Sequence, residues 1–173
     1  PQQPAADVRR LLRLAPGQAA HARGLRGSCG GGWLALGPDG IAALAPRAVA
    51  LPGVTPLAEL DLALYADTER DPVDPRHVAS GPPGARLPLH ARLPVPADAE
   101  LVVRARCDGD RMRLRQGTRA LQDVLTDAGV PRLVRDLLPV VVDARDEPVW
   151  VPGVAVARMP ESLAHVRAWL APF

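Results

Sequence analysis

Residues 117–136 read GTRALQDVLTDAGVPRLVRD, and they predict local structure more clearly than any other stretch of the chain. Their apolar residues recur at intervals of three and four, as on a helix with one buried face. These residues are Leu121, Val124, Leu125 and Ala128. Thr118 is a suitable N-cap, Gly129 stands where a left-handed residue ends a helix, and Pro131 blocks continuation. We therefore predict a helix over residues 118–128.

The charges of this helix lie at unexpected ends. Arg119 falls in the predicted first turn and Asp127 in the last, and each placement opposes the helix dipole by about 0.3–1 kcal/mol if exposed. A helix N-terminus offers free N–H groups to an anion. Arg119 beside those groups predicts a corner that binds phosphate. The alternative is an ion pair between Arg119 and Asp123, four residues later.

Further arginines flank the helix on both sides. Two strands are expected at residues 101–106 and 111–115, joined by a turn centred on Asp108-Gly109. The segment 104–119 carries Arg104, Arg106, Arg111, Arg113, Arg115 and Arg119 against Asp108 and Asp110. A short helix near residues 132–137 places Arg132 and Arg135 one turn apart. These two arginines could extend the same basic face; for Arg135, a salt bridge or a solvated pair with Asp136 is the alternative.

The bulk composition limits the classes of protein that the chain can represent. All 21 basic residues among the 173 are arginine, and the net charge is +2, too small by itself to indicate a nucleic-acid partner. Codon bias in a GC-rich genome is the preferred explanation of an all-arginine chain, and selection for bidentate phosphate contacts is the alternative. Cys29 and Cys107 show no metal-ligand spacing. No apolar run approaches the roughly 20 residues of a membrane helix, so we expect a cytoplasmic protein without a membrane partner.

Patterning along the chain predicts an α+β, mostly β fold. LDLALYAD at residues 60–67 alternates as a strand does, and residues 139–158 are expected to form strands with turns between them. PESLAHVRAWL at residues 160–170 has the spacing of a terminal helix. We expect a small β-sandwich-like domain with two or three short helices, preceded by an irregular region that contains strands.

Three parts are expected along the chain. Residues 1–66 are the end of a middle domain, with the tail of a helix and strands. Residues 67–100 form a proline-rich connection, which is either a linker or a long surface segment within one domain. Residues 101–173 form the C-terminal domain. Because the chain begins with Pro1 rather than methionine, we expect it to be a piece of a longer protein.

Several short motifs in residues 109–157 occur in a characteristic order. They are Gly109-Asp110-Arg111, Gly117-Thr118-Arg119, Val130-Pro131, Arg135-Asp136, Pro139 and Trp150-Val151 followed by Gly153. This order resembles the C-terminal domain of bacterial tRNA(Ile)-lysidine synthetases, and the resemblance continues more weakly upstream. The family's domain is a β-sandwich-like module that is also seen in the β chain of phenylalanyl-tRNA synthetase.

The resemblance implies a function for the whole protein and a docking role for this part. The family uses ATP, with magnesium, and lysine to convert the wobble cytidine of a minor tRNA(Ile) to lysidine. Its ATP-binding Ser-Gly-Gly-x-Asp-Ser loop belongs to the N-terminal catalytic domain and does not occur in this chain. The implied partners are therefore tRNA(Ile) and the N-terminal catalytic domain of the same polypeptide, with a homodimer as a further possibility.

The site expected from the resemblance is a tRNA-binding surface. Its members are Arg104, Arg106, Arg111, Arg113, Arg115, Thr118, Arg119, Arg132 and Arg135. No catalytic, cofactor-binding or metal-binding residue is expected in this chain. Ala120 and Gln122 stand where relatives usually carry lysines, and phosphate contacts dominate nucleic-acid affinity. Either Arg104, Arg106, Arg113 and Arg115 compensate for the missing charges, or this domain contributes less to tRNA binding than its relatives do. The alternative function is a structural or oligomerisation module of an RNA-modification enzyme, without direct tRNA contact.

Overall fold

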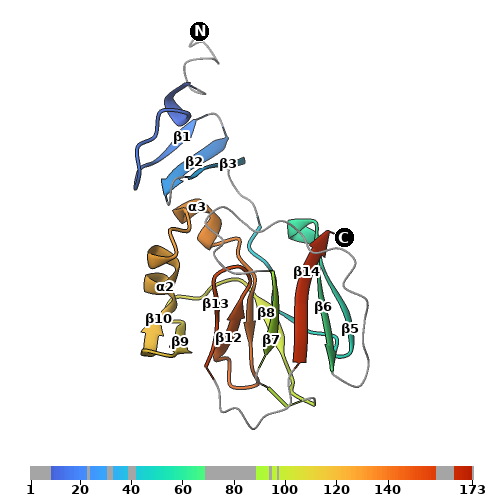
Figure 1. The fold of residues 1–173 in the computed structure, drawn as a ribbon. Coiled ribbons are helices and arrows are strands. Elements are labelled where there is room, and N and C mark those ends of the chain that lie inside the picture. The colour runs from blue at the N-terminus through green and yellow to red at the C-terminus, as the bar shows by residue number, and fades with distance from the viewer. Residues whose placement is uncertain are drawn as a thin grey trace.

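A computed structural model describes residues 9–22, 24–30, 33–38, 42–68, 89–93, 95–96, 98–158 and 166–172 (Figure 1). Strands predominate among these residues, and the helices are short. The longest helix that lies wholly within these residues is α2 (Leu121–Asp127), which is followed by α3 (Arg132–Arg135). A 3-10 turn, η1, spans Ala58–Leu60. The prediction of an α+β, mostly β fold is confirmed.

A five-stranded antiparallel sheet forms the centre of the C-terminal part. Its strands, in spatial order, are β13 (Ala155–Val156), β12 (Pro148–Val151), β11 (Val140–Val142), β8 (Val102–Arg104) and β4 (Arg47–Ala48). Every residue of β11 and β12 is buried, which fits their continuous apolar sequence, because a strand covered on both faces needs no polar alternation. The strands expected within residues 139–158 are thus confirmed.

A second, four-stranded antiparallel sheet covers one face of the central sheet. Its order is β5 (Gly53–Leu57), β6 (Leu62–Thr68), β14 (Val166–Pro172) and β7 (His90–Leu93). The two sheets share one hydrophobic core, to which Val103 and Val141 contribute from the central sheet and Leu64 and Leu170 from the second. This arrangement confirms the expected β-sandwich.

The opposite face of the central sheet is covered by α2 and a small hairpin. The hairpin consists of β9 (Arg111–Leu114) and β10 (Gly117–Ala120). Met112 and Leu121 are fully buried here with Val140 and Val142, whereas Val141 between them faces the other core. Each such fully buried side chain contributes about 1.5–3 kcal/mol, so this second core fixes the hairpin and helix on the sandwich.

A separate three-stranded sheet lies toward the N-terminus. It consists of β1 (Ala19–Ala22), β2 (Leu25–Gly30) and β3 (Trp33–Pro38), and residues 9–11 before it are helical. Figure 1 shows this sheet beside α3, and α3 contacts β2 and β3. It corresponds to the strand-containing region that was expected before the sandwich.

The predicted division of the chain into parts ending at residues 66 and 100 stays a prediction. Hydrogen bonds join strands from both sides of these boundaries. β4 pairs with β8, and β6 pairs with β14 from Leu62 opposite Pro172 to Thr68 opposite Val166. Most of the proline-rich connection, residues 69–88, lies outside the described residues.

Three local predictions are wrong. Residues 166–172 form strand β14 rather than the end of a terminal helix, because they pair on both sides, with β6 and with β7. β8 and β9 do not pair with each other; β8 pairs with β11 and β4, and β9 pairs with β10. Thr118 is therefore a strand residue rather than an N-cap, and α2 begins at Leu121 after Ala120, which makes no side-chain capping bond.

The C-terminal end of α2 matches the prediction in detail. Gly129 has φ of 72°, the left-handed conformation that glycine adopts without strain. Its N–H donates to the carbonyl of Thr126 at 2.9 Å, and the N–H of Val130 donates to the carbonyl of Leu125 at 3.0 Å. These two bonds form a Schellman motif. The motif directs the chain through Pro131 into α3 and thereby sets where the arginines of α3 lie.

Candidate nucleic-acid interface

The β9–β10 hairpin presents basic side chains on its outer face. Successive residues of a strand point to opposite faces, so Met112 is buried while Arg111 and Arg113 are exposed. Thr118 lies directly opposite Arg113 in the register and shares this outer face. Arg115 is exposed in the turn that joins the strands. The structure thus brings together four of the predicted site residues on one solvent-facing surface.

Arg119 lies on the other face of the hairpin, opposite Met112 in the register. Its Nη1 lies 2.8 Å from Oδ2 of Asp127, and both side chains are partly exposed. The partner is therefore Asp127 rather than Asp123. The guanidinium of Arg119 lies beside Asp127, the last residue of α2, so its charge does not oppose the helix dipole. It instead neutralises Asp127, the residue whose charge is unfavourable at the C-terminal end of the helix.

Arg104 is almost completely buried, and its guanidinium is held by carboxylates. It makes a bidentate contact with Asp110, at 3.0 and 2.8 Å, and its Nε donates to Oδ1 of Asp146 at 2.8 Å. The hydrogen bond to Asp110 is the main reason that the pKa of Arg104 is raised further above its ordinary value. Asp110 also accepts the N–H of Cys107 at 2.8 Å. Arg104 thus connects β8 to the turn that leads into the arginine-bearing hairpin.

The remaining predicted residues line a cleft between α3 and the N-terminal sheet. Arg106 reaches Asp108 at 3.0 Å and Asp136 at 3.2 Å. Burial alone would lower the pKa of Arg106, but the hydrogen bonds and negative charges of Asp136 and Asp108 together outweigh burial and raise the pKa. Arg132 is exposed, and Arg135 is half-buried. The structure therefore divides the nine predicted residues among a hairpin face, an ion pair, a buried network and this cleft.

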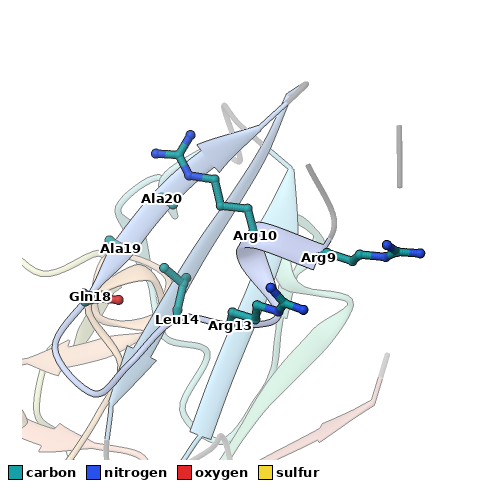
Figure 2. Close-up of a pocket in the computed structure, with 7 residues that line it drawn as sticks. All are labelled: Arg9, Arg10, Arg13, Leu14, Gln18, Ala19 and Ala20. Atoms are coloured by element: carbon teal, nitrogen blue, oxygen red, sulfur yellow. The ribbon is translucent and has the colours of Figure 1, made fainter. Parts of the chain in front are cut away.

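A further group of arginines was not identified from the sequence. Arg9, Arg10 and Arg13 line a pocket of about 660 Å³ beside β1. Figure 2 shows that their three guanidinium groups point in different directions rather than converging on one point. The repeated arginines of VRRLLR, residues 8–13, are the indication that the sequence offers for this group.

In the described part of the chain, no three histidine, cysteine or acidic side chains are grouped so that they could hold a metal ion. Cys29 and Cys107 are free thiols. In the same residues no helix is long and apolar enough to cross a membrane.

The fold and these surfaces define a small β-sandwich domain that carries arginines on a hairpin and along a cleft. A family model described as the TilS substrate C-terminal domain matches residues 101–170. The tRNA(Ile)-lysidine synthase of Symbiobacterium thermophilum is 41% identical over 122 residues, which cover 69% of this chain and 23% of that protein. The chain belongs to the tRNA(Ile)-lysidine synthase family and corresponds to its C-terminal portion.

A shorter match to a second relative agrees with this assignment. The tRNA(Ile)-lysidine synthase of Deinococcus radiodurans is 48% identical over 59 residues, which cover 34% of this chain and 10% of that protein. The chain spans less than a quarter of the length of either relative. A solved structure titled "Crystal structure of TILS C-terminal domain" aligns with a TM-score of 0.49 at 25% identity, covering 75% of this chain and 98% of that one.

Proposed function

We propose that this chain docks tRNA(Ile) for a tRNA(Ile)-lysidine synthase, so that the wobble cytidine reaches a catalytic domain elsewhere in the same polypeptide. That domain would use ATP, with magnesium, and lysine to form lysidine, and this chain would supply no catalytic residue. The similarity to tRNA(Ile)-lysidine synthases supports this reaction. The arginine-bearing surfaces support the docking role, because phosphate contacts provide most of the affinity for nucleic acids.

The observation that carries this proposal is the outer face of the β9–β10 hairpin. Arg111, Arg113 and Thr118 point to solvent from neighbouring strands, while the opposite face is anchored by Met112. Among the described residues, the only hydrogen bond of these guanidinium groups is a long one of 3.4 Å, which Arg111 donates to the carbonyl of Thr118. Side chains that are exposed and weakly engaged can bind phosphate without first breaking an ion pair.

We further propose different roles for the predicted residues. The exposed arginines of the hairpin and of α3 contact RNA phosphates. Arg104 is buried and satisfied by Asp110 and Asp146, so its role is to hold the hairpin in place. Arg119 combines features of both groups. Its guanidinium is paired with Asp127, as a structural arginine is, but both side chains remain partly exposed, so RNA can still reach it.

Replacing Arg113 with glutamine in the full-length synthase is expected to weaken tRNA(Ile) binding at least about 10-fold, as the loss of one charge-assisted hydrogen bond implies. The slope of log affinity against log salt should become shallower by about one, because one fewer counterion is released. Filter binding at several salt concentrations measures both quantities.

The matched control is Arg92→Gln. It removes the same charge from an exposed arginine of β7, in the sheet on the other side of the sandwich. Its affinity and salt slope should stay near the wild-type values. Equal losses in both variants would contradict a specific hairpin contact. Unchanged tRNA affinity in both, together with a concentration-dependent dimer, would instead favour an oligomerisation module.

Replacing Asp127 with asparagine is expected to increase tRNA affinity about 2- to 5-fold. The substitution frees Arg119 from an exposed ion pair worth at most about 1 kcal/mol and removes a negative charge near the RNA. Asp123→Asn removes the same charge one turn earlier in α2, and should raise the affinity less. If the two substitutions raise the tRNA affinity equally, Asp127 exerts only a general charge effect, and its ion pair does not keep Arg119 from the RNA.

A further inference from the structure

The cleft between α3 and the N-terminal sheet has a volume of about 900 Å³. One wall comes from the N-terminal part of the chain, including Ser28 and Cys29 of β2. The other comes from the C-terminal domain, including Arg106, Arg132 and Arg135. Residues from both parts of the chain therefore form one site.

The positive charge in this cleft is only partly neutralised. Arg106 is paired with Asp108 and Asp136, although its Nε is buried without a hydrogen-bond acceptor in the described structure. Arg135 donates to neutral acceptors, the carbonyl of Val130 at 2.9 Å and the hydroxyl of Thr126 at 3.0 Å. For Arg132, no ion pair is found among the described residues. The cleft thus holds three guanidinium groups and two paired carboxylates.

The environment of Arg135 shows that these positive groups affect one another. Burial lowers its pKa, and the charges of Arg106 and Arg132 lower it further. The side chain stays protonated at neutral pH, because arginine loses its proton only far above pH 7. A bound anion would relieve the repulsion among the three groups. Phosphate fits the donors, because guanidinium groups bind its oxygens with two parallel hydrogen bonds.

We propose that this cleft holds a backbone phosphate of the bound RNA beside Arg132 and Arg135, and thereby fixes the N-terminal sheet against the C-terminal domain. This inference rests on the proposed docking function and adds a second contact region to the hairpin. RNA bound here would contact both parts of the chain at once. The cleft would then set the relative orientation of the parts as well as contribute affinity.

Two thiols allow the cleft and the hairpin to be tested separately. Cys29 is partly buried and lines the cleft, whereas Cys107 is exposed and lies in a hollow with Arg111, Arg113 and Thr118. In the full-length synthase, peptide mass spectrometry measures the rate at which each cysteine is alkylated, with and without saturating tRNA(Ile). We expect the bound RNA to slow alkylation of both thiols severalfold.

Arg132→Gln supplies the variant for this test, because Arg132 is exposed and its substitution disturbs no observed ion pair. The variant should lose most of the protection of Cys29 and keep the protection of Cys107 at saturating tRNA. Arg92→Gln is the charge-matched control. In this variant, bound tRNA should slow alkylation of both thiols as much as it does in the wild-type protein. Unimpaired protection of Cys29 in Arg132→Gln would overturn the proposed phosphate contact.

The other outcomes separate this inference from the proposed function. Protection of Cys107 without protection of Cys29 overturns the cleft site and leaves hairpin docking intact. Protection of neither thiol by bound tRNA overturns both proposals. Millimolar inorganic phosphate and ATP are each tested in place of RNA. If either protects Cys29 as strongly as tRNA does, the cleft binds a small phosphate ligand, and the assignment to RNA is overturned.

Discussion

Replacing Arg104 with methionine is expected to lower the free energy of unfolding by about 3–5 kcal/mol, the range measured when one partner of a buried ion pair is removed. Methionine preserves much of the apolar stem but leaves the carboxylate of Asp110, whose side chain is only 7% exposed, without its bidentate partner. Because Asp110 directly precedes β9, the damage should spread to the hairpin. Urea denaturation followed by tryptophan fluorescence measures the loss.

Asp146→Asn is the matched control for this prediction. Asp146 contacts the same guanidinium, but its side chain is 70% exposed, so water can replace the lost charge interaction. Its backbone has φ of 62°, a conformation that asparagine tolerates. The expected loss is about 1 kcal/mol or less. A similarly small loss in Arg104→Met would show that Arg104 does not hold the base of the hairpin.

Replacing Arg167 with methionine is expected to cost a similar amount, about 3–5 kcal/mol, in the other sheet. Arg167 and Asp67 lie directly opposite each other on β14 and β6, and the guanidinium binds both carboxylate oxygens at 2.8 and 2.7 Å. Asp67 is completely buried. The variant therefore leaves a buried carboxylate without its bidentate partner, which thermal and urea unfolding should both detect.

Arg167→Lys makes this second prediction more specific. Lysine keeps the positive charge but cannot reproduce two parallel hydrogen bonds to one carboxylate. An intermediate loss, about 1–2 kcal/mol, is therefore expected. If both variants cost less than about 1 kcal/mol, the pair contributes no more than an ordinary surface ion pair, and our account of the second sheet is wrong.

Local sequence patterns predicted the elements that depend on local interactions. The apolar spacing of α2 and the glycine at its end need only neighbouring residues, and the Schellman motif at Gly129 followed as expected. The start of α2 was misplaced because Thr118 has two possible uses, as a helix cap or as a strand residue. Thr118 is a strand residue because it pairs with Arg113 across the hairpin.

Elements that depend on distant partners were not predictable from the same patterns. Residues 166–172 have apolar side chains at positions compatible with either a helix or a strand. Strand pairing is decided by β6, about 100 residues earlier in the chain, as the contact between Arg167 and Asp67 shows. The same holds for β8, whose partner is β11 rather than the adjacent β9.

For the candidate site too, the sequence could not predict features that depend on distant residues. The sequence grouped nine residues by charge and by resemblance, but charge does not distinguish a solvent-facing arginine from a buried one. Burial and the carboxylates around Arg104 make it a structural residue in our proposal, although it has the same side chain as Arg113. The cleft could not be predicted either, because its walls come from residues more than 70 positions apart, such as Cys29 and Arg132.

Photochemical cross-linking of tRNA(Ile) to the full-length synthase, with the cross-linked peptides identified by mass spectrometry, tests the docking claim most directly. Our account predicts cross-links within the β9–β10 hairpin, residues 111–120, that decline in Arg113→Gln and persist in Arg92→Gln. Efficient cross-linking confined to regions outside residues 101–170, with none in the hairpin, would contradict it.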